Sequence, residues 1–253
     1  VEQIKVARRH DDTIDYLRRH HALFTFGENV PSKDFPVPKR GFTWLATRQP
    51  IVTDFWKTSR RPAPAAVFTS VANWNTSGRK DIAWRGEKYL WSKSREFLRF
   101  IAAPRRARES FELSTDISAA ATRARFERHG WRLQPTRRLS AHHHLYRNYI
   151  RRSKGEFTVA KDQYVRLHTG WFSDRSACYL AAGRPVITQE TGFTKNYAAA
   201  GGLFGFHSLG EIAEAVRMIN ADYARHSRAA HALAREIFEA ETVLKSLLER
   251  AGI

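Results

Sequence analysis

Short apolar runs alternate along this chain with longer segments whose apolar residues recur at helical spacing. The short runs are typical of strands buried in a sheet and lie at residues 66–72, 110–114, 131–133, 185–189 and 203–206. The helical segments lie at residues 88–101, 116–129, 140–150, 173–182 and 209–223. Strands that alternate with helices predict an α/β fold, a parallel sheet covered by helices on both faces with ligands at the carboxyl ends of its strands.

Both ends of the chain add elements to this alternating pattern. They are a helix at residues 1–20, a strand at 21–26, a proline-rich connection at 30–50, an extended segment at 51–56 and a last helix at 229–251. We therefore expect a partial N-terminal α/β segment with its linker before the main sheet. Since the sequence begins with Val1 and enters a helical pattern at once, it looks like a processed or partial chain.

The charge balance changes what partners are expected. The chain has 43 Lys and Arg residues against 25 Asp and Glu residues, a formal net charge of +18. Such a surplus suits nucleic acid, an acidic membrane surface or phosphate-bearing substrates. The arginines are scattered over every element, often in pairs such as Arg151-Arg152, and no segment has the pattern of a zinc finger, homeodomain or RNA-recognition motif. We expect no specific nucleic-acid partner and leave contact with a membrane surface open.

Several other classes of protein are disfavoured. No apolar run approaches the ~20 residues that span a bilayer, and no secretory signal pattern opens the sequence, so we expect a cytoplasmic protein without a transmembrane segment. The single cysteine, Cys178, excludes an internal disulfide. His142, His143 and His144 are consecutive and point to different faces of a helix, so no metal site is expected.

A glycine-containing turn before one helix carries the candidate chemistry. The turn is His168-Thr169-Gly170-Trp171, Ser173 is a suitable N-cap, and Gly183 ends the helix. A turn that opens onto a helix N-terminus presents unpaired N–H groups and the positive end of the helix dipole. The sequence therefore predicts an anion site, such as one for a phosphate, at Thr169 to Ser173.

Residues 155–193, with this turn and the later Gly183-x-Pro185, resemble the nucleotide-sugar-binding segment of bacterial GT-B glycosyltransferases. A second stretch, residues 72–97, resembles the start of the same domain. The resemblance implies a Rossmann-like nucleotide-sugar-binding domain at residues 51–226, a remnant of the N-terminal acceptor domain at 1–50, and a C-terminal helix at 227–253 that packs back across the domain junction. It also implies a nucleotide-sugar donor as substrate and no metal or other cofactor.

The candidate site follows from that resemblance and from charge. A departing diphosphate is stabilised best by cations and fixed N–H groups. Glu190 follows the 185–189 strand, where an acid suits sugar or ribose hydroxyls. The candidates are Asn73, Trp74, Asn75, Arg85, Lys93, His168, Thr169, Gly170, Trp171 and Ser173 for the diphosphate, Asp174, Glu190, Thr191 and Gly192 for the sugar or ribose, and Glu156, Phe157 and Lys161 for the base or phosphate.

Alternatives stay open at several of these positions. Arg85 and Lys93 also fit a solvated helix face, and Glu190 also fits a local cap. Glu156 and Lys161 also fit a surface pair, and Asp174 also fits a pair with Arg175. No residue matches the family's catalytic base, and the acceptor is also unidentified. The chain is expected to be a glycosyltransferase or, alternatively, a nucleotide-binding or assembly module without turnover; a basic nucleic-acid-binding protein is a third hypothesis resting on charge alone.

Overall fold

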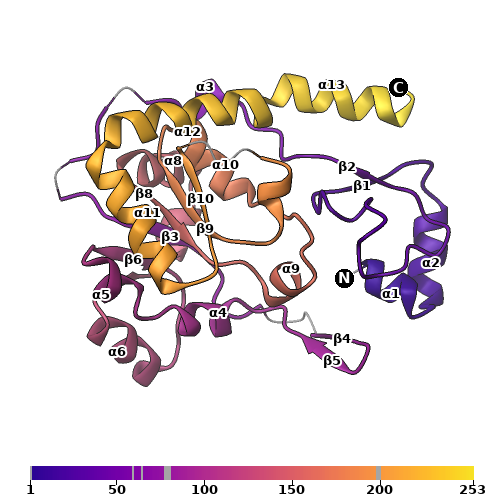
Figure 1. Ribbon diagram of the computed structural model, residues 1–253, viewed down its shortest axis with the longest axis horizontal. Helices are drawn as coiled ribbons and strands as arrows, with labels where there is room; N and C mark the ends of the chain where they lie inside the picture. Colours follow the sequence, from indigo (N-terminus) through magenta and orange to yellow (C-terminus); the bar gives the residue numbers. More distant parts are fainter. Residues whose placement is uncertain (1, 59, 64, 77–80, 198–200) are drawn as a thin grey trace.

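A computed structural model describes residues 2–58, 60–63, 65–76, 81–197 and 201–253. Its centre is a six-stranded sheet in which all the paired strands run parallel (Figure 1). The strands are β3 (Phe68–Val71), β6 (Phe111–Ser114), β7 (Trp131–Gln134), β8 (Gly155–Thr158), β9 (Val186–Gln189) and β10 (Leu203–Phe206). All of the predicted strands of the main sheet are confirmed, and β8 is an additional strand that the pattern did not predict.

The order of these strands is that of a doubly wound sheet. They lie side by side as β7-β6-β3-β8-β9-β10, so the chain starts in the middle, builds one half outward, then returns to build the other. This is the Rossmann-like order, and the direction of winding changes between β3 and β8. Such a switch point leaves a crevice outside the carboxyl ends of the two strands.

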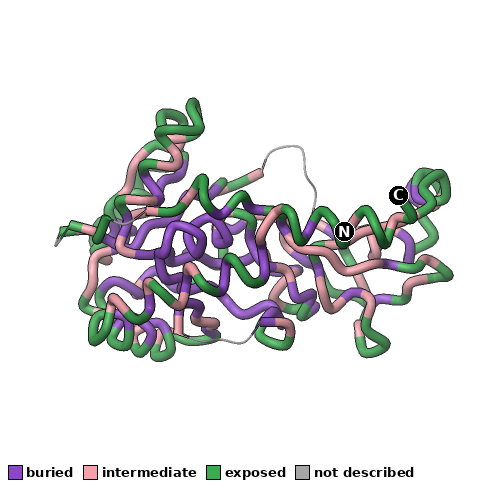
Figure 2. The backbone as a smooth tube through the Cα atoms, turned by 90° about the horizontal axis from the view of Figure 1, so that it is seen from above, coloured by how far each residue is buried: buried purple, intermediate pink, exposed green. Residues whose placement is uncertain are grey.

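Alternating strand side chains divide the core between the two faces of the sheet. Ile187 packs in one hydrophobic cluster and Val186, its neighbour in β9, packs in the other. Helices α4 (Ser94–Arg99), α5 (Ala103–Ala107), α6 (Ala120–Arg128) and α11 (Leu209–Ala221) cover the first face. Helices α8 (His143–Arg152), α10 (Asp174–Ala181) and α12 (Tyr223–Phe238) cover the second. Figure 2 shows that buried backbone concentrates in this body.

A smaller N-terminal part lies beside the sheet (Figure 1). It contains α1 (Glu2–Ala7), α2 (Asp11–Arg18) and the short parallel pair β1 (Leu23–Thr25) and β2 (Trp44–Ala46). The last helix, α13 (Ala240–Ala251), extends from the main body toward it. A side-chain N–H of Arg250 donates to the carbonyl oxygen of Ala46, 2.5 Å away.

The two passages of chain between the N-terminal part and the main body run side by side. The backbone N–H of Ile51 donates to Phe238 O at 2.7 Å, and the N–H of Ala240 donates to Ile51 O at 3.0 Å. The hydroxyl of Thr53 also donates to the carboxylate of Glu239. These bonds tie α3 (Thr53–Trp56) to the junction of α12 and α13.

Several predicted elements are wrong in detail. The helix at 1–20 is two helices, because Arg9 adopts a left-handed φ of 58° between them. The helix at 88–101 begins only at Ser94, since an antiparallel hairpin of β4 (Ile82–Trp84) and β5 (Glu87–Tyr89) takes up the residues before it. Pro104 lies in the first turn of α5 (Ala103–Ala107), where a missing N–H loses no hydrogen bond within the helix.

Other predicted elements also differ at their ends. The helix predicted at 116–129 begins only at Ala120 as α6, and the side chain of Asp116 accepts a bond from Thr136 N. The extended segment at 51–56 is the helical turn α3, the 140–150 helix is split into α7 (Arg137–Ser140) and α8, and the 229–251 helix is divided at Glu239 into α12 and α13. At the start of α11, Ser208 and Glu211 form a capping box. Within the described residues, no helix has the length and apolarity needed to cross a bilayer.

Candidate functional site

A cavity lies at the switch point of the sheet, where the strand order predicts a ligand crevice. It has a volume of about 550 Å³. We call it the switch-point cavity; its walls are Val71, Ala72, Asn73, Thr76, Trp91, Lys93, Thr136, Ser140, Lys161, Trp171, Ser173, Asp174 and Arg175. Residues that follow β3 and β8 thus meet the first turn of α10 at one place.

Among the described residues, three cations line this cavity. Lys93 precedes α4, Lys161 precedes α9 (Asp162–Arg166), and Arg175 belongs to the first turn of α10. Lys93 is only 8% exposed, and no carboxylate of the described residues lies within ion-pair distance of its ammonium group. Burial, together with the positive charges of Arg175 and Lys161, lowers the pKa of Lys93 well below its usual value. A bound anion would stabilise the protonated, positively charged form of Lys93.

Arg175 holds the two central strands together at the floor of the cavity. Its guanidinium donates to Val71 O at 2.6 Å and to the hydroxyl of Thr158 at 2.7 Å, and it pairs with the carboxylate of Glu156. Burial opposes the charge of Arg175, but Glu156 outweighs it and raises the pKa of the guanidinium. Glu156 is fully buried, so the predicted surface pair of Glu156 with Lys161 is wrong.

The N-terminus of α10 opens into the cavity. Ser173 is at the N-cap position, but its hydroxyl donates to Asp174 Oδ1 at 3.3 Å and makes no cap bond to the helix. The first N–H groups of α10 therefore have no side-chain cap, and the positive end of the dipole faces the cations of the cavity wall. This arrangement favours an anionic ligand, and Asp174 supplies a carboxylate beside it.

The predicted cradle needs correction at Thr169 and Gly170. Their amides are already bonded inside the protein, Thr169 N to Tyr164 O at 3.2 Å and Gly170 N to Thr191 O at 2.8 Å. Gly170 has a φ of +73°, and a Cβ there would lie 2.9 Å from Asn29. Thr169 and Gly170 thus pack against the N-terminal part, and of this turn only Trp171 lines the switch-point cavity.

Asn29 fastens this turn from the N-terminal side. Its side-chain amide donates to His168 O at 2.8 Å and to Gly192 O at 3.0 Å. Its own backbone N–H donates to Thr169 O at 3.0 Å. His168 therefore contributes a backbone carbonyl to an internal network instead of a side chain to a ligand.

Of the four residues predicted for the sugar or ribose, only Asp174 lines the switch-point cavity. Thr191 donates through its hydroxyl to Trp171 O at 2.6 Å, and Glu190 accepts from the N–H of Gly192. Glu190, Thr191 and Gly192 are buried behind the same turn, and none of these three lines the switch-point cavity. The local-cap interpretation of Glu190 fits its contact, and a role in ligand binding stays a prediction.

Four other candidates lie outside the cavity. Trp74 turns into the core and stacks on Phe97 with ring centroids 6.4 Å apart. Phe157 is 1% exposed within the same core. Arg85 lies in the turn of the β4–β5 hairpin, and Asn75 is exposed nearby without lining either cavity described here. The stretch at 72–97 also includes residues 77–80, which lie outside the described residues.

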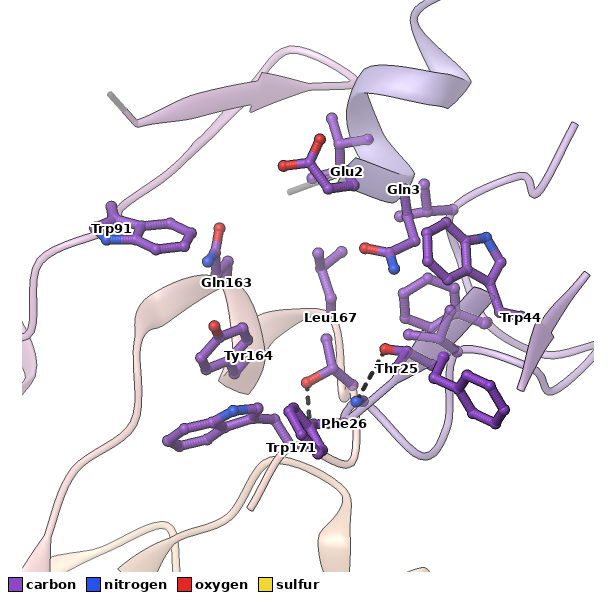
Figure 3. A pocket seen from close by; sticks show the side chains of 17 residues that line it. Glu2, Gln3, Thr25, Phe26, Trp44, Trp91, Gln163, Tyr164, Leu167 and Trp171 are labelled. Atoms are coloured by element: carbon purple, nitrogen blue, oxygen red, sulfur yellow. Dashed lines mark hydrogen bonds between the residues drawn. The ribbon is translucent and has the colours of Figure 1, made fainter. Parts of the chain in front are cut away.

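A second cavity, of about 310 Å³, lies between the N-terminal part and the main body (Figure 3). Aromatic rings dominate its wall, so we call it the aromatic cavity. It is lined by Glu2, Gln3, Ile4, Phe24, Thr25, Phe26, Gly27, Val30, Phe35, Val37, Trp44, Trp91, Gln163, Tyr164, Leu167, Thr169 and Trp171. Trp91 and Trp171 line both cavities, so the two share a wall.

Sequence reasoning missed this second cavity and several lining residues of the first, among them Arg175. The apolar spacing of the chain cannot bring residues 2–44 against residues 163–171, because that contact depends on the packing of two separate parts. Arg175 was considered only as a partner of Asp174. No pattern of the sequence signalled its pairing with Glu156, because residues 155–158 were not recognised as a strand.

No protein-family profile matches this sequence, and no curated protein matches it. Solved structures do match in fold. TarM is 11% identical with a TM-score of 0.56, over 96% of this chain and 46% of that one. A glycosyltransferase from Rickettsia africae ESF-5 is 10% identical with a TM-score of 0.59, over 95% and 66%. Sucrose-phosphate synthase from Thermosynechococcus elongatus is 12% identical with a TM-score of 0.54, over 90% and 57%.

The chain has a GT-B-type fold. At 10–12% identity the likeness shows the fold alone, and it confirms the fold that the 155–193 segment implied. The chain spans between about half and two thirds of the length of these proteins. In this GT-B-type fold, the switch-point cavity lies beyond the carboxyl ends of β3 and β8, and the aromatic cavity lies between the main body and the N-terminal part.

Proposed function

We propose that this chain is the donor-binding part of a glycosyltransferase that moves a sugar from a nucleotide-diphosphate sugar to a hydroxyl acceptor. The observation that carries the proposal is the gathering of Lys93, Lys161 and Arg175 around the open N-terminus of α10, in a cavity at the switch point of a GT-B-type fold. Nucleotide sugars are made inside cells, so the proposal includes action in the cytoplasm. It also includes the division of the chain at residues 1–50, 51–226 and 227–253.

The chemistry needs a site that stabilises a leaving diphosphate. The acceptor oxygen forms a bond to C1 of the sugar, the bond from C1 to the phosphate oxygen breaks, and the diphosphate leaves with the electron pair. The acceptor proton passes to a base or to solvent. Fixed cations and N–H groups stabilise the charge that grows on the leaving oxygen, without the reorganisation that water would need.

Each wall of the cavity has a part in this proposal. Lys93 and Lys161 contact the diphosphate directly, and the first N–H groups of α10 bind its oxygens. Arg175 already pairs with Glu156, so it fixes the floor and adds positive potential. Asn73 and Asp174 face the sugar or ribose hydroxyls. With these cations in place, the transfer requires no divalent metal.

A nucleotide-binding assay tests the proposal. UDP, GDP, ADP and dTDP are added to the 253-residue chain, and the nucleotide that fits raises the melting temperature, because it binds only the folded state. At a concentration 100 times the dissociation constant, the stabilisation is about 2.7 kcal/mol. EDTA leaves the shift unchanged, and Lys161→Met reduces it. If none of the four nucleotides raises the melting temperature, the proposed site does not exist.

A module that binds a nucleotide without turnover is the second candidate. Among the described residues, Glu2 and Asp174 are the only carboxylates that line the two cavities, and neither has been matched to a catalytic base. Release of free sugar from the matching nucleotide sugar distinguishes the two functions. Slow donor hydrolysis that depends on Lys93 supports the transferase, whereas nucleotide binding with no hydrolysis and no transfer supports the module.

A further inference from the structure

The aromatic cavity differs in chemistry from the rest of this basic protein. Of the described residues that line it, Glu2 is the only one with a charged side chain, and no Lys or Arg is among them. The carboxylate of Glu2 is itself 3.3 Å from the ammonium group of Lys5. In a chain with 43 basic residues, the cavity is therefore close to neutral.

A phosphate or carboxylate is poorly suited to such a place. Moving an anion out of water is costly unless a cation or several donors receive it. Lys93 and Lys161 line the switch-point cavity but not this one. The ammonium group of Lys161 lies over the Trp91 ring, 3.5 Å from its centroid, so the shared wall separates the cations from the aromatic cavity.

Aromatic side chains from both parts of the molecule line the wall. Figure 3 shows Trp91, Tyr164 and Trp171 of the main body on one side and Trp44 of the N-terminal part on the other. Tyr164 and Trp171 are stacked, with ring centroids 4.7 Å apart and planes 21° apart. Extended aromatic surface of this kind binds ligands with an apolar face.

One buried polar group points to hydroxyls on that ligand. Gln163 is 3% exposed, and its Nε2 has no hydrogen-bond partner among the described residues. Figure 3 shows its amide between Trp91 and Glu2, at the cavity wall. A buried amide without a partner costs roughly 1–3 kcal/mol, so a ligand hydroxyl that pairs with it gains affinity. An aliphatic chain would leave the amide unpaired.

We propose that the aromatic cavity binds a neutral, hydroxyl-bearing ring, and that the acceptor of the proposed transfer is an uncharged saccharide or glycoside. The role of this ligand as an acceptor rests on the proposed function, whereas the preference of the cavity for a neutral ring does not. A pyranose ring has an apolar C–H face for the aromatic side chains and hydroxyls for Gln163. The wall shared through Trp91 and Trp171 places such a ring next to the donor.

Matched ligands test the charge preference. Methyl β-glucoside, methyl α-mannoside, glucose 6-phosphate and glucuronate are added separately to the 253-residue chain, with and without the nucleotide that binds. Binding is measured by tryptophan fluorescence, because Trp44, Trp91 and Trp171 line the cavity, and by saturation-transfer NMR of the ligand. We expect a neutral glycoside to bind at least tenfold more tightly than both charged sugars.

Two variants place the binding in this cavity. Gln163→Leu removes the amide and is expected to weaken glycoside binding about fivefold or more. Tyr164→Leu removes an aromatic face and is expected to weaken it about threefold or more. Gln134→Leu and exposed Tyr16→Leu are the matched controls, since neither residue lines the cavity. Circular dichroism and nucleotide binding confirm that each variant is folded.

The outcomes separate this inference from the proposed function. If a nucleotide binds but glucose 6-phosphate or glucuronate binds as tightly as the neutral glycosides, or no glycoside binds, the inference is wrong and the donor site stands. If glycosides bind as expected and no nucleotide does, the donor site is wrong and the cavity is a saccharide site of another kind. Equal losses in the variants and their controls also overturn the inference.

Discussion

Replacing Lys93 with methionine is expected to make the protein more stable and less able to bind nucleotide. Lys93 is 8% exposed, its neighbours include Arg175 and Lys161, and no carboxylate of the described chain pairs with it. Methionine has nearly the same length and no charge. Replacing buried ionic groups by apolar ones of similar volume stabilises proteins by roughly 1–4 kcal/mol, so we expect about 2 kcal/mol here. For a chain of this size, that raises the melting temperature by about 4–8 °C.

The same substitution removes a contact that only the ligand uses. A hydrogen bond to a charged partner contributes about 2 kcal/mol, which corresponds to about thirtyfold weaker nucleotide binding. Differential scanning calorimetry of the free protein gives the first quantity, and isothermal titration with the nucleotide gives the second. Lys245→Met, on the exposed face of α13, is the control and should change neither. A Lys93→Met variant that is less stable than the native chain, or that binds nucleotide equally well, would refute the reasoning.

Three further outcomes follow from the same contacts. Glu156→Gln leaves the buried guanidinium of Arg175 without its counter-charge and should destabilise the fold by about 3 kcal/mol, seen as a lower urea midpoint at unchanged slope. Gly170→Ala should cost about 1–3 kcal/mol, because φ is +73° and Asn29 lies where the methyl group would go; unchanged stability would contradict the packing of this turn. The pKa of Lys93 is lower in the folded protein than in the unfolded chain, so the free energy of unfolding should rise with pH between the two pKa values. Nucleotide affinity should fall over the same range, because the ammonium group loses its proton. Unfolding and binding measured at several pH values check both trends, and Lys93→Met should remove both.

The strands of the sheet were predictable because local patterns decide them. Residues 185–189 and 203–206 are apolar runs of the right length, and both are strands in the structure. Element boundaries were less predictable where backbone geometry intervenes. Arg9 adopts a left-handed conformation that apolar spacing does not report, and it divides the first helix in two.

The sequence predicted where the candidate site lies but not which hydrogen bonds its residues make. The segment around Ser173 does open a helix at the switch point, and Lys93 does lie in the same cavity. The sequence could not show that the amide of Gly170 would donate to Thr191 O, since that bond depends on how two loops 21 residues apart meet. Nor could it show that Arg175 would find Glu156, because the β8 strand was not recognised.

The N-terminal part is bonded to the rest of the chain at several separate points, and this limits how far the two parts can move relative to one another. Two of these points are the backbone bridge between Ile51 and Glu239 and the side-chain amide of Asn29, which donates to His168 O and Gly192 O. Opening the space between the two parts would break the bonds of Asn29 and also that of Glu28 with Tyr197. It would also separate Ile4 and Val37 from Leu167, so apolar surface as well as hydrogen bonds keeps this space closed.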